Sequence, residues 1–210
     1  MKNKILSGIL AVVLSMTFLN GNVTKAEEVD TGSYLTDEQI IKLNEALEVM
    51  VEEANENLAQ GNENFVISKK VSGIEEPITL GFSSDALPTN AKLSTKSISP
   101  LAATAVTAKE YSAYVGYSGV GFDFSHVLYG DFTYSGGKVK GATKNVALNG
   151  PFYEKTHDTP PIDKLDPSVW EVKSTGTFKG LKFFKEYKTY LVVRLLGSGH
   201  YRIEDARMTG

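Results

Sequence analysis

Apolar residues recur in alternating steps of three and four near the start of the chain, the spacing of one face of an α-helix. They are Ile40, Leu43, Leu47, Met50, Ala54 and Leu58. Thr36 and Gln39 have the spacing of a capping box, and Leu35 and Ile40 that of a hydrophobic staple. Gly61 follows, where a helix is expected to end. We therefore predict an amphipathic helix that begins after Thr36. Its solvated face carries four glutamates, Glu45, Glu48, Glu52 and Glu56.

Beyond this helix the pattern changes to alternation of apolar and polar residues, which is typical of half-buried strands. Two short segments, 65–71 and 78–82, are candidates for a hairpin. Longer segments follow at the spacing of an all-β domain: 111–117, 122–134, 138–148, 170–178, 187–196 and 200–208. Gly-rich turns at 135–137 and 197–199 are expected to join neighbouring strands. The polar segment 149–168, rich in proline and charge, is expected to be a loop.

These elements predict a mainly β protein, an antiparallel sandwich or small barrel in the C-terminal part, with one N-terminal amphipathic helix after a signal peptide. Residues 83–104 are rich in Ser, Thr, Ala and Pro and lack aromatic side chains, a composition typical of a linker. We therefore expect four segments. They are a signal peptide at 1–26, an acidic helical appendage with two short strands at 27–82, a linker at 83–104 and an antiparallel β domain at 105–210.

The first residues have the order of a secretory signal, with a basic start at Lys2 and Lys4, an apolar stretch at 5–19 and cleavage expected after Ala26. The apolar stretch is shorter than the roughly 20 residues that span a bilayer. No second stretch of that length follows, so we expect a secreted, extracellular protein with no transmembrane segment in the mature chain. The absence of cysteine excludes disulfides and thiolate zinc sites, and is compatible with a bacterial exporter.

Charge is distributed unevenly along the chain. Residues 27–104 contain 14 acidic residues and 5 lysines, a net charge of −9, whereas residues 105–210 contain 11 acidic and 14 basic residues, a net charge of +3. An acidic helix that keeps the protein soluble would account for this asymmetry. A basic half that meets an anionic surface after release would account for it equally well.

Lysines and apolar residues each recur every three positions within residues 179–188. A short basic amphipathic helix and a lysine-bearing edge strand both fit this spacing. We favour the edge strand, because Gly180 is a poor helix residue and the segment that follows is β-branched.

No catalytic or metal-binding pattern stands out. The only histidines are His126, His157 and His200, and no nucleophile-elbow motif accompanies them. The segment from His157 to Asp166 contains four residues able to ligate a metal, but such crowding in a loop is usually a solvated surface. A carboxylate pair for glycoside hydrolysis could be drawn from seven acidic residues: Asp123, Asp131, Glu154, Asp158, Glu171, Glu204 and Asp205. We expect no cofactor and no metal site.

The C-terminal part is rich in aromatic and basic residues, and tyrosines on the outer face of a sheet commonly bind ligands. Cross-strand pairing would explain the same tyrosines without any ligand. The candidate ligand-binding residues are Tyr114, Tyr129, Trp170, Lys182, Lys185 and Lys188.

Three functions are compatible with this sequence. The first is a secreted, non-enzymatic module that binds an anionic cell-wall polymer, a membrane surface or another protein, with no nucleic-acid partner. The second is a toxin or bacteriocin-like protein released when residues 27 to about 104 are removed as an acidic pro-region. The third is a secreted hydrolase.

Overall fold

The computed structural model describes residues 35–84, 106–119, 122–150, 154–179 and 186–210. Its helix α1 (Asp37–Ala59) begins as predicted. Gln39 N–H donates to Thr36 Oγ1 (3.2 Å) and Thr36 N–H donates to Gln39 Oε1 (2.8 Å), so both halves of the capping box form. The stripe of six apolar residues is buried, and Gly61 follows with a φ of 81°. The sequence prediction of this helix is confirmed.

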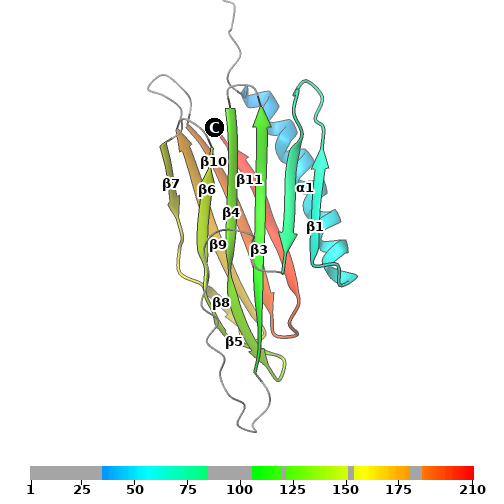
Figure 1. The fold of residues 1–210 in the computed structure, drawn as a ribbon, viewed down its shortest axis with the longest axis vertical. Helices are drawn as coiled ribbons and strands as arrows, with labels where there is room; N and C mark the ends of the chain where they lie inside the picture. Colours follow the sequence, from blue (N-terminus) through cyan, green and yellow to red (C-terminus); the bar gives the residue numbers. More distant parts are fainter. Residues whose placement is uncertain (1–34, 85–105, 120–121, 151–153, 180–185) are drawn as a thin grey trace, which may run out of the picture. The chain divides into compact units, whose positions relative to one another are not determined.

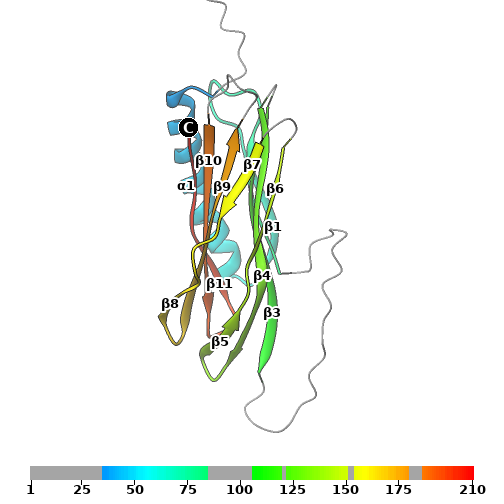
Figure 2. The ribbon, with the colours of Figure 1, turned by 90° about the vertical axis from the view of Figure 1, so that its left-hand side faces the viewer.

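Two antiparallel sheets form a sandwich (Figures 1 and 2), which confirms the mainly β fold class. Sheet A has the order β1-β2-β3-β4-β5, with β6 also paired to β4. Its strands are β1 (Asn64–Lys69), β2 (Ile78–Ser83), β3 (Thr107–Gly119), β4 (Phe122–Ser135), β5 (Lys138–Ala142) and β6 (Asn145–Asn149). Sheet B has the order β11-β10-β9-β7, with β8 also paired to β9. Its strands are β7 (Glu154–Asp158), β8 (Asp163–Asp166), β9 (Val169–Lys179), β10 (Glu186–Leu196) and β11 (Tyr201–Thr209).

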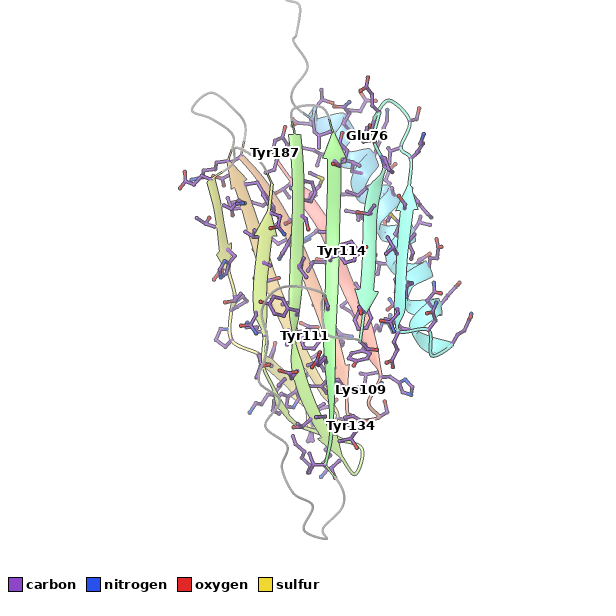
Figure 3. The ribbon with its side chains drawn as sticks, in the orientation of Figure 1. Glu76, Lys109, Tyr111, Tyr114, Tyr134 and Tyr187 are labelled. Atoms are coloured by element: carbon purple, nitrogen blue, oxygen red, sulfur yellow. The ribbon has the colours of Figure 1, made fainter. Side chains whose placement is uncertain are left out.

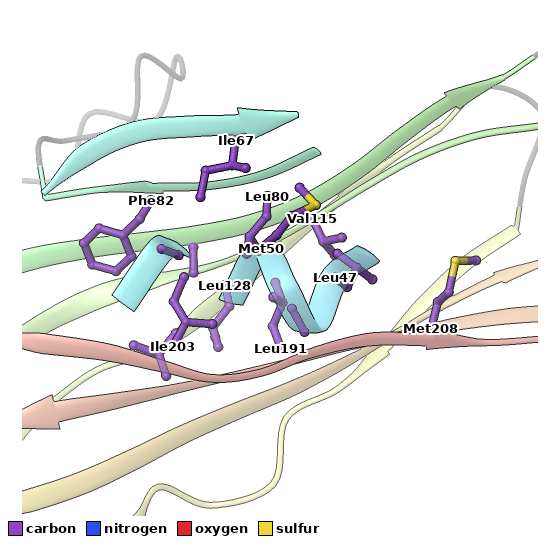
Figure 4. Close-up of a cluster of buried hydrophobic side chains, with 14 of the residues drawn as sticks. Leu47, Met50, Ile67, Leu80, Phe82, Val115, Leu128, Leu191, Ile203 and Met208 are labelled. Atoms are coloured by element: carbon purple, nitrogen blue, oxygen red, sulfur yellow. The ribbon is translucent and has the colours of Figure 1, made fainter. Parts of the chain in front are cut away.

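The hydrophobic core lies between the sheets, and α1 closes one edge of it. The helix contacts β11 of sheet B and β1 and β2 of sheet A. Leu47 and Met50 of the helix belong to one buried cluster with Leu80 of β2 and Ile203 of β11 (Figure 4), and all four side chains are fully buried. The amphipathic stripe therefore has a specific partner, since it fills the space that the two sheets leave open at this edge.

The segments on either side of residues 83–104 share one sheet and one core. Strand β2 pairs with β3 from Ile78↔Tyr117 to Ser83↔Ser112. Lys109 of β3 (Figure 3) also donates to Glu63 Oε1 (2.7 Å), just before β1, and to the Gly199 carbonyl (3.0 Å) in the turn before β11. Residues 35–84 are thus part of the sandwich and not an appendage to a separate domain. Composition misled the boundary prediction because pairing across a long connection leaves no local pattern. Residues 85–105 lie outside the described residues.

Three other expectations need correction. The predicted strand 138–148 is two strands, β5 and β6, separated at Thr143 and Lys144. The predicted loop 149–168 contains strands β7 and β8, whose residues are all exposed and so show no alternation of apolar and polar residues. Finally, β10 has β9 on one side and β11 on the other, so Lys188 does not lie on an edge strand. Residues 180–185 lie outside the described residues.

Candidate functional site

The outer face of sheet A carries an uncharged surface of three neighbouring rows, each crossing β1, β2, β3, β4 and β6. The first row is Asn64, Ser83, Ser112, Tyr129 and Asn145; the second is Val66, Gly81, Tyr114, Val127 and Ala147; the third is Ser68, Thr79, Gly116, Ser125 and Asn149. None of these residues is Asp, Glu, Lys, Arg or His. We call this set the neutral face.

Tyr114 lies at the centre of the neutral face, on β3 (Figure 3). Its cross-strand partner is Gly81, and a Cβ atom at Gly81 would overlap Cε1 and Cζ of the Tyr114 ring. The ring therefore lies over the backbone of β2, in the space where any other residue would have its side chain. Tyr114 is partly exposed, and burial raises its pKa. This arrangement places a partly exposed aromatic ring at the centre of the neutral face.

Ser112 is the neighbouring outward residue on β3 and is paired with Tyr129 on β4. It is only 2% exposed, and its Oγ has no hydrogen-bond partner among the described residues. A buried hydroxyl usually has a partner, because losing its bonds to water costs about 1–3 kcal/mol. In the same row the Ser83 hydroxyl donates to Asn64 Oδ1 (2.8 Å). The neutral face thus combines a flat ring with hydroxyl and amide groups, one of which lacks a partner.

The outer face of sheet B is different, because charged residues alternate across its strands. Arg194 donates to Glu171 Oε2 (2.9 Å) and pairs with Glu204 (3.0 Å), and Lys173 pairs with Glu171 (2.7 Å). Burial alone would raise the pKa of Glu171, but the bonds from Lys173 and Arg194 outweigh it and lower that pKa. The basic residues on this face are therefore engaged by carboxylates of the same face.

His126 lies inside the sandwich between the two sheets. Its Nδ1 is 2.8 Å from Thr189 Oγ1 on β10, and its Nε2 is 2.8 Å from Ser174 Oγ on β9. Burial, with a smaller contribution from His157, lowers the pKa of His126 to about 3. The imidazole is therefore neutral at pH 7. Because His126, Ser174 and Thr189 are all buried, a substrate cannot reach either hydroxyl. These contacts join the sheets and do not form an open catalytic pair.

The predicted binding residues do not lie together. Tyr114 and Tyr129 share the neutral face on adjacent strands, as diagonal neighbours. Trp170 is buried, with Lys164 Nζ 4.4 Å from its ring centre. Lys188 lies on β10 of sheet B, 3.2 Å from Glu186. Lys182 and Lys185 lie outside the described residues. The sequence prediction did not include Gly81 or Ser112. The only indication of their place in the sequence is that each alternates with the inward-pointing apolar residues of its strand, β2 or β3.

Acidic residues also gather away from the neutral face. Within the described part of the chain, no group of three or more His, Asp or Glu residues could hold a metal ion. A groove of about 390 Å³ between α1 and β11 is lined in part by Glu48, Glu52, Glu204 and Asp205. Burial raises the pKa of Asp205, and nearby Arg207 opposes that shift at an oxygen–nitrogen distance of 3.1 Å. This groove has acidic walls but no further feature that points to a ligand.

Within the described residues, no helix has both the length and the apolar character needed to cross a membrane. Comparison of the chain with protein families, with curated proteins and with solved structures finds no match.

Proposed function

We propose that this protein is an exported, non-enzymatic binding module that contacts its partner through the neutral face. The observation that carries the proposal is the contrast between the two outer surfaces. Three rows of the neutral face lack charge and contain a partly exposed aromatic ring, whereas Lys173 and Arg194 on the outer face of sheet B are paired with carboxylates. Surfaces that bind are enriched in aromatic residues and depleted in charge at their centre. The partner is expected in the cell envelope, where an exported protein first arrives.

A matched pair of substitutions tests this proposal. Val127 and Val192 both lie in mid-strand, point outward and are partly exposed, Val127 on the neutral face and Val192 on sheet B. We expect Val127→Arg to reduce co-sedimentation with the envelope of the producing cells at least tenfold, because it places a charge beside Tyr114. Val192→Arg should bind as the unmodified protein does. Circular dichroism spectra of both variants check that the fold is intact, and equal binding by the two would contradict the proposal.

The pro-region hypothesis has less support. Removing residues 27 to about 104 would take away β2, which pairs with β3, and also α1, which covers the core beside β11. Met50 and Leu80 would be removed, and the core side chains of the remaining strands that pack against them would become exposed. We therefore do not propose it. Among the described residues, no pair of carboxylates is arranged in a way that supports a hydrolase.

A further inference from the structure

We propose that the ligand of the neutral face is an uncharged glycan chain, held by stacking of a sugar ring on Tyr114. This inference rests on the proposed function and names its ligand class. A pyranose ring has an apolar C–H face and a rim of hydroxyl groups. The neutral face offers the complement to both, an aromatic ring and a surround of Ser, Thr and Asn side chains.

The stacking surface depends on how Tyr114 is held. Because Gly81 has no side chain, the Tyr114 ring extends over the backbone of β2, and its Cε1, Cζ and hydroxyl oxygen lie where a Cβ atom of residue 81 would be. The face of an aromatic ring is electronegative, so it attracts the weakly positive C–H groups of a sugar. Val66 and Val127 belong to the same row, one on either side of the Gly81–Tyr114 pair, and Val66 is 63% exposed. These neighbours are small enough to let a flat ligand reach the ring.

Hydroxyl recognition would come from the groups beside the ring. A serine hydroxyl both donates and accepts, as a sugar hydroxyl does, so the two can bond in either direction. Ser68 and Ser125, in the row on the other side of Tyr114 from Ser112, are exposed and partly exposed and so are open to a ligand, whereas Ser112 Oγ is buried. Asn145 and Asn149, on β6, supply amides at the side of the face away from β1. Five strands at about 4.8 Å spacing give a face roughly 19 Å across, enough for several sugar rings.

The absence of charge selects between ligand chemistries. An anionic polymer or lipid headgroup would be favoured by free cations, and none lies in the three rows of the neutral face. On the outer face of the other sheet, Lys173, Lys188 and Arg194 are paired with carboxylates. A neutral glycan should therefore bind with little dependence on salt, because screening acts only on charges.

The test uses the mature chain and two neutral probes, the β-1,4-linked hexasaccharides of N-acetylglucosamine and of glucose, titrated with detection by NMR and calorimetry. We expect at least one to bind with a dissociation constant in the millimolar range or tighter. Tyr114→Ala should weaken binding roughly tenfold or more, and Tyr114→Phe, which keeps the ring, should stay within about threefold. Raising sodium chloride from 50 to 500 mM should change the affinity less than about twofold.

Gly81→Ala tests the position of the ring rather than its presence. The new methyl group must displace the Tyr114 ring, which can swing away without disturbing the backbone. Binding should weaken several-fold while stability changes little. Tyr190→Ala is the control, since Tyr190 lies on sheet B with the Arg207 guanidinium 4.9 Å from its ring centre. It should bind as the unmodified protein does.

Several outcomes would overturn the glycan assignment: no shift with either hexasaccharide, binding unaffected by Tyr114→Ala, or a tenfold loss of affinity in high salt. If Val127→Arg still abolishes envelope binding in that case, the neutral face remains the contact surface and its ligand is of another class. If both tests fail, the face has no binding role. Loss of binding on shortening residues 85–105, with Tyr114→Ala unaffected, would assign the binding to that segment instead.

Discussion

The side chain of Asn44 exchanges two hydrogen bonds with the backbone of Met208. Asn44 Nδ2 donates to the Met208 carbonyl and the Met208 amide donates to Asn44 Oδ1, both at 2.8 Å. Asn55 makes the same pair of bonds with Ile203, at 2.8 and 2.9 Å. Strand β11 is the edge of sheet B, so the helix supplies the donor and acceptor that a further strand would have supplied.

The spacing of the two contacts follows from the geometry of helix and strand. Eleven helical residues rise about 16.5 Å and five strand residues rise about the same distance. Residues an odd number of positions apart on a regular strand direct their backbone N–H and C=O groups to opposite sides, as Ile203 and Met208 would. The bulge at Glu204, where Val192 pairs with Asp205 and Val193 with Ile203, adds one residue. The backbone groups of Ile203 and Met208 therefore both point toward the helix. Edge strands left uncovered invite aggregation, and here the two asparagines cover one.

We predict that Asn44→Ala lowers the free energy of unfolding by about 1–3 kcal/mol, because it leaves a partly buried amide and carbonyl of Met208 unpaired. Asn55→Ala should cost a similar amount and the double variant close to the sum, since the sites are far apart. Urea unfolding measures both. Asn57→Ala is the control, since among the described residues the Asn57 side chain bonds only to Glu53 O and to Asn62 Nδ2, both at 2.9 Å, and to neither sheet. Equal losses at all three positions would contradict the edge-covering role.

Stability should fall as the pH drops below the unfolded-state pKa of His126. The folded pKa is about 3 and the ordinary value is 6.5, so between these values the unfolded chain takes up a proton that the folded chain refuses. Stability from this group is full above pH 6.5 and is lost toward pH 3. Between pH 7.0 and 5.5 we expect a loss of about 1.3 kcal/mol, measured by urea unfolding.

This loss should be absent in His126→Asn, whose side chain does not titrate, and present in His200→Ala, whose histidine is exposed. A gain in stability on acidification from pH 7.0 to 5.5 would show that His126 is charged in the folded protein, contrary to its burial. The window stops at pH 5.5 so that the carboxylates stay ionised.

Glu171→Gln should destabilise the protein at pH 7 by about 1–2 kcal/mol, because Arg194 and Lys173 lose their shared partner; their partial exposure keeps the loss below that of a fully buried pair. The pKa of Glu171 is lowered on folding, so its contribution is present above pH 4.5 and is lost as the pH falls through the folded value. The difference between variant and unmodified protein should therefore vanish in acid. Glu38→Gln, which breaks an exposed helix pair, should show no measurable change.

Cutting the chain within residues 85–105 should not separate its two parts. With a site-specific protease sequence inserted there, residues 35–84 should co-elute with residues 106–210 after cleavage, because β2 pairs with β3 and α1 covers the core. Gel filtration and intact mass measure this. Expressed alone, residues 105–210 should be poorly folded. A native-like spectrum from that fragment would contradict the single shared core.

Export predicts that the protein recovered from the medium of its native host begins at Glu27. Intact mass with N-terminal sequencing checks this. A chain that begins near residue 100 would instead support the pro-region hypothesis.

Much of the local structure could be predicted from the sequence. Helix α1 (Asp37–Ala59) was predictable from its capping box and its periodic apolar stripe, and the turn at Gly136 and Gly137, both with positive φ, from its two glycines. Strands β3 and β4 followed from alternation, since their inward residues are buried in the sandwich. Strands β7 and β8 could not be predicted, because they are exposed on both sides and burial is what produces alternation.

The residues of the neutral face separate what the sequence determines from what the tertiary structure determines. The sequence by itself determined that Tyr114 and Tyr129 point away from the apolar residues of their strands, because side-chain direction alternates along a strand. Only the tertiary structure decided that Gly81 lies beneath Tyr114, that Lys188 and Trp170 lie elsewhere, and that Asn44 meets Met208. Those relationships depend on which strands pair and in which register. Pairing between segments separated by a long connection is set by the fit of the whole core and not by any local pattern.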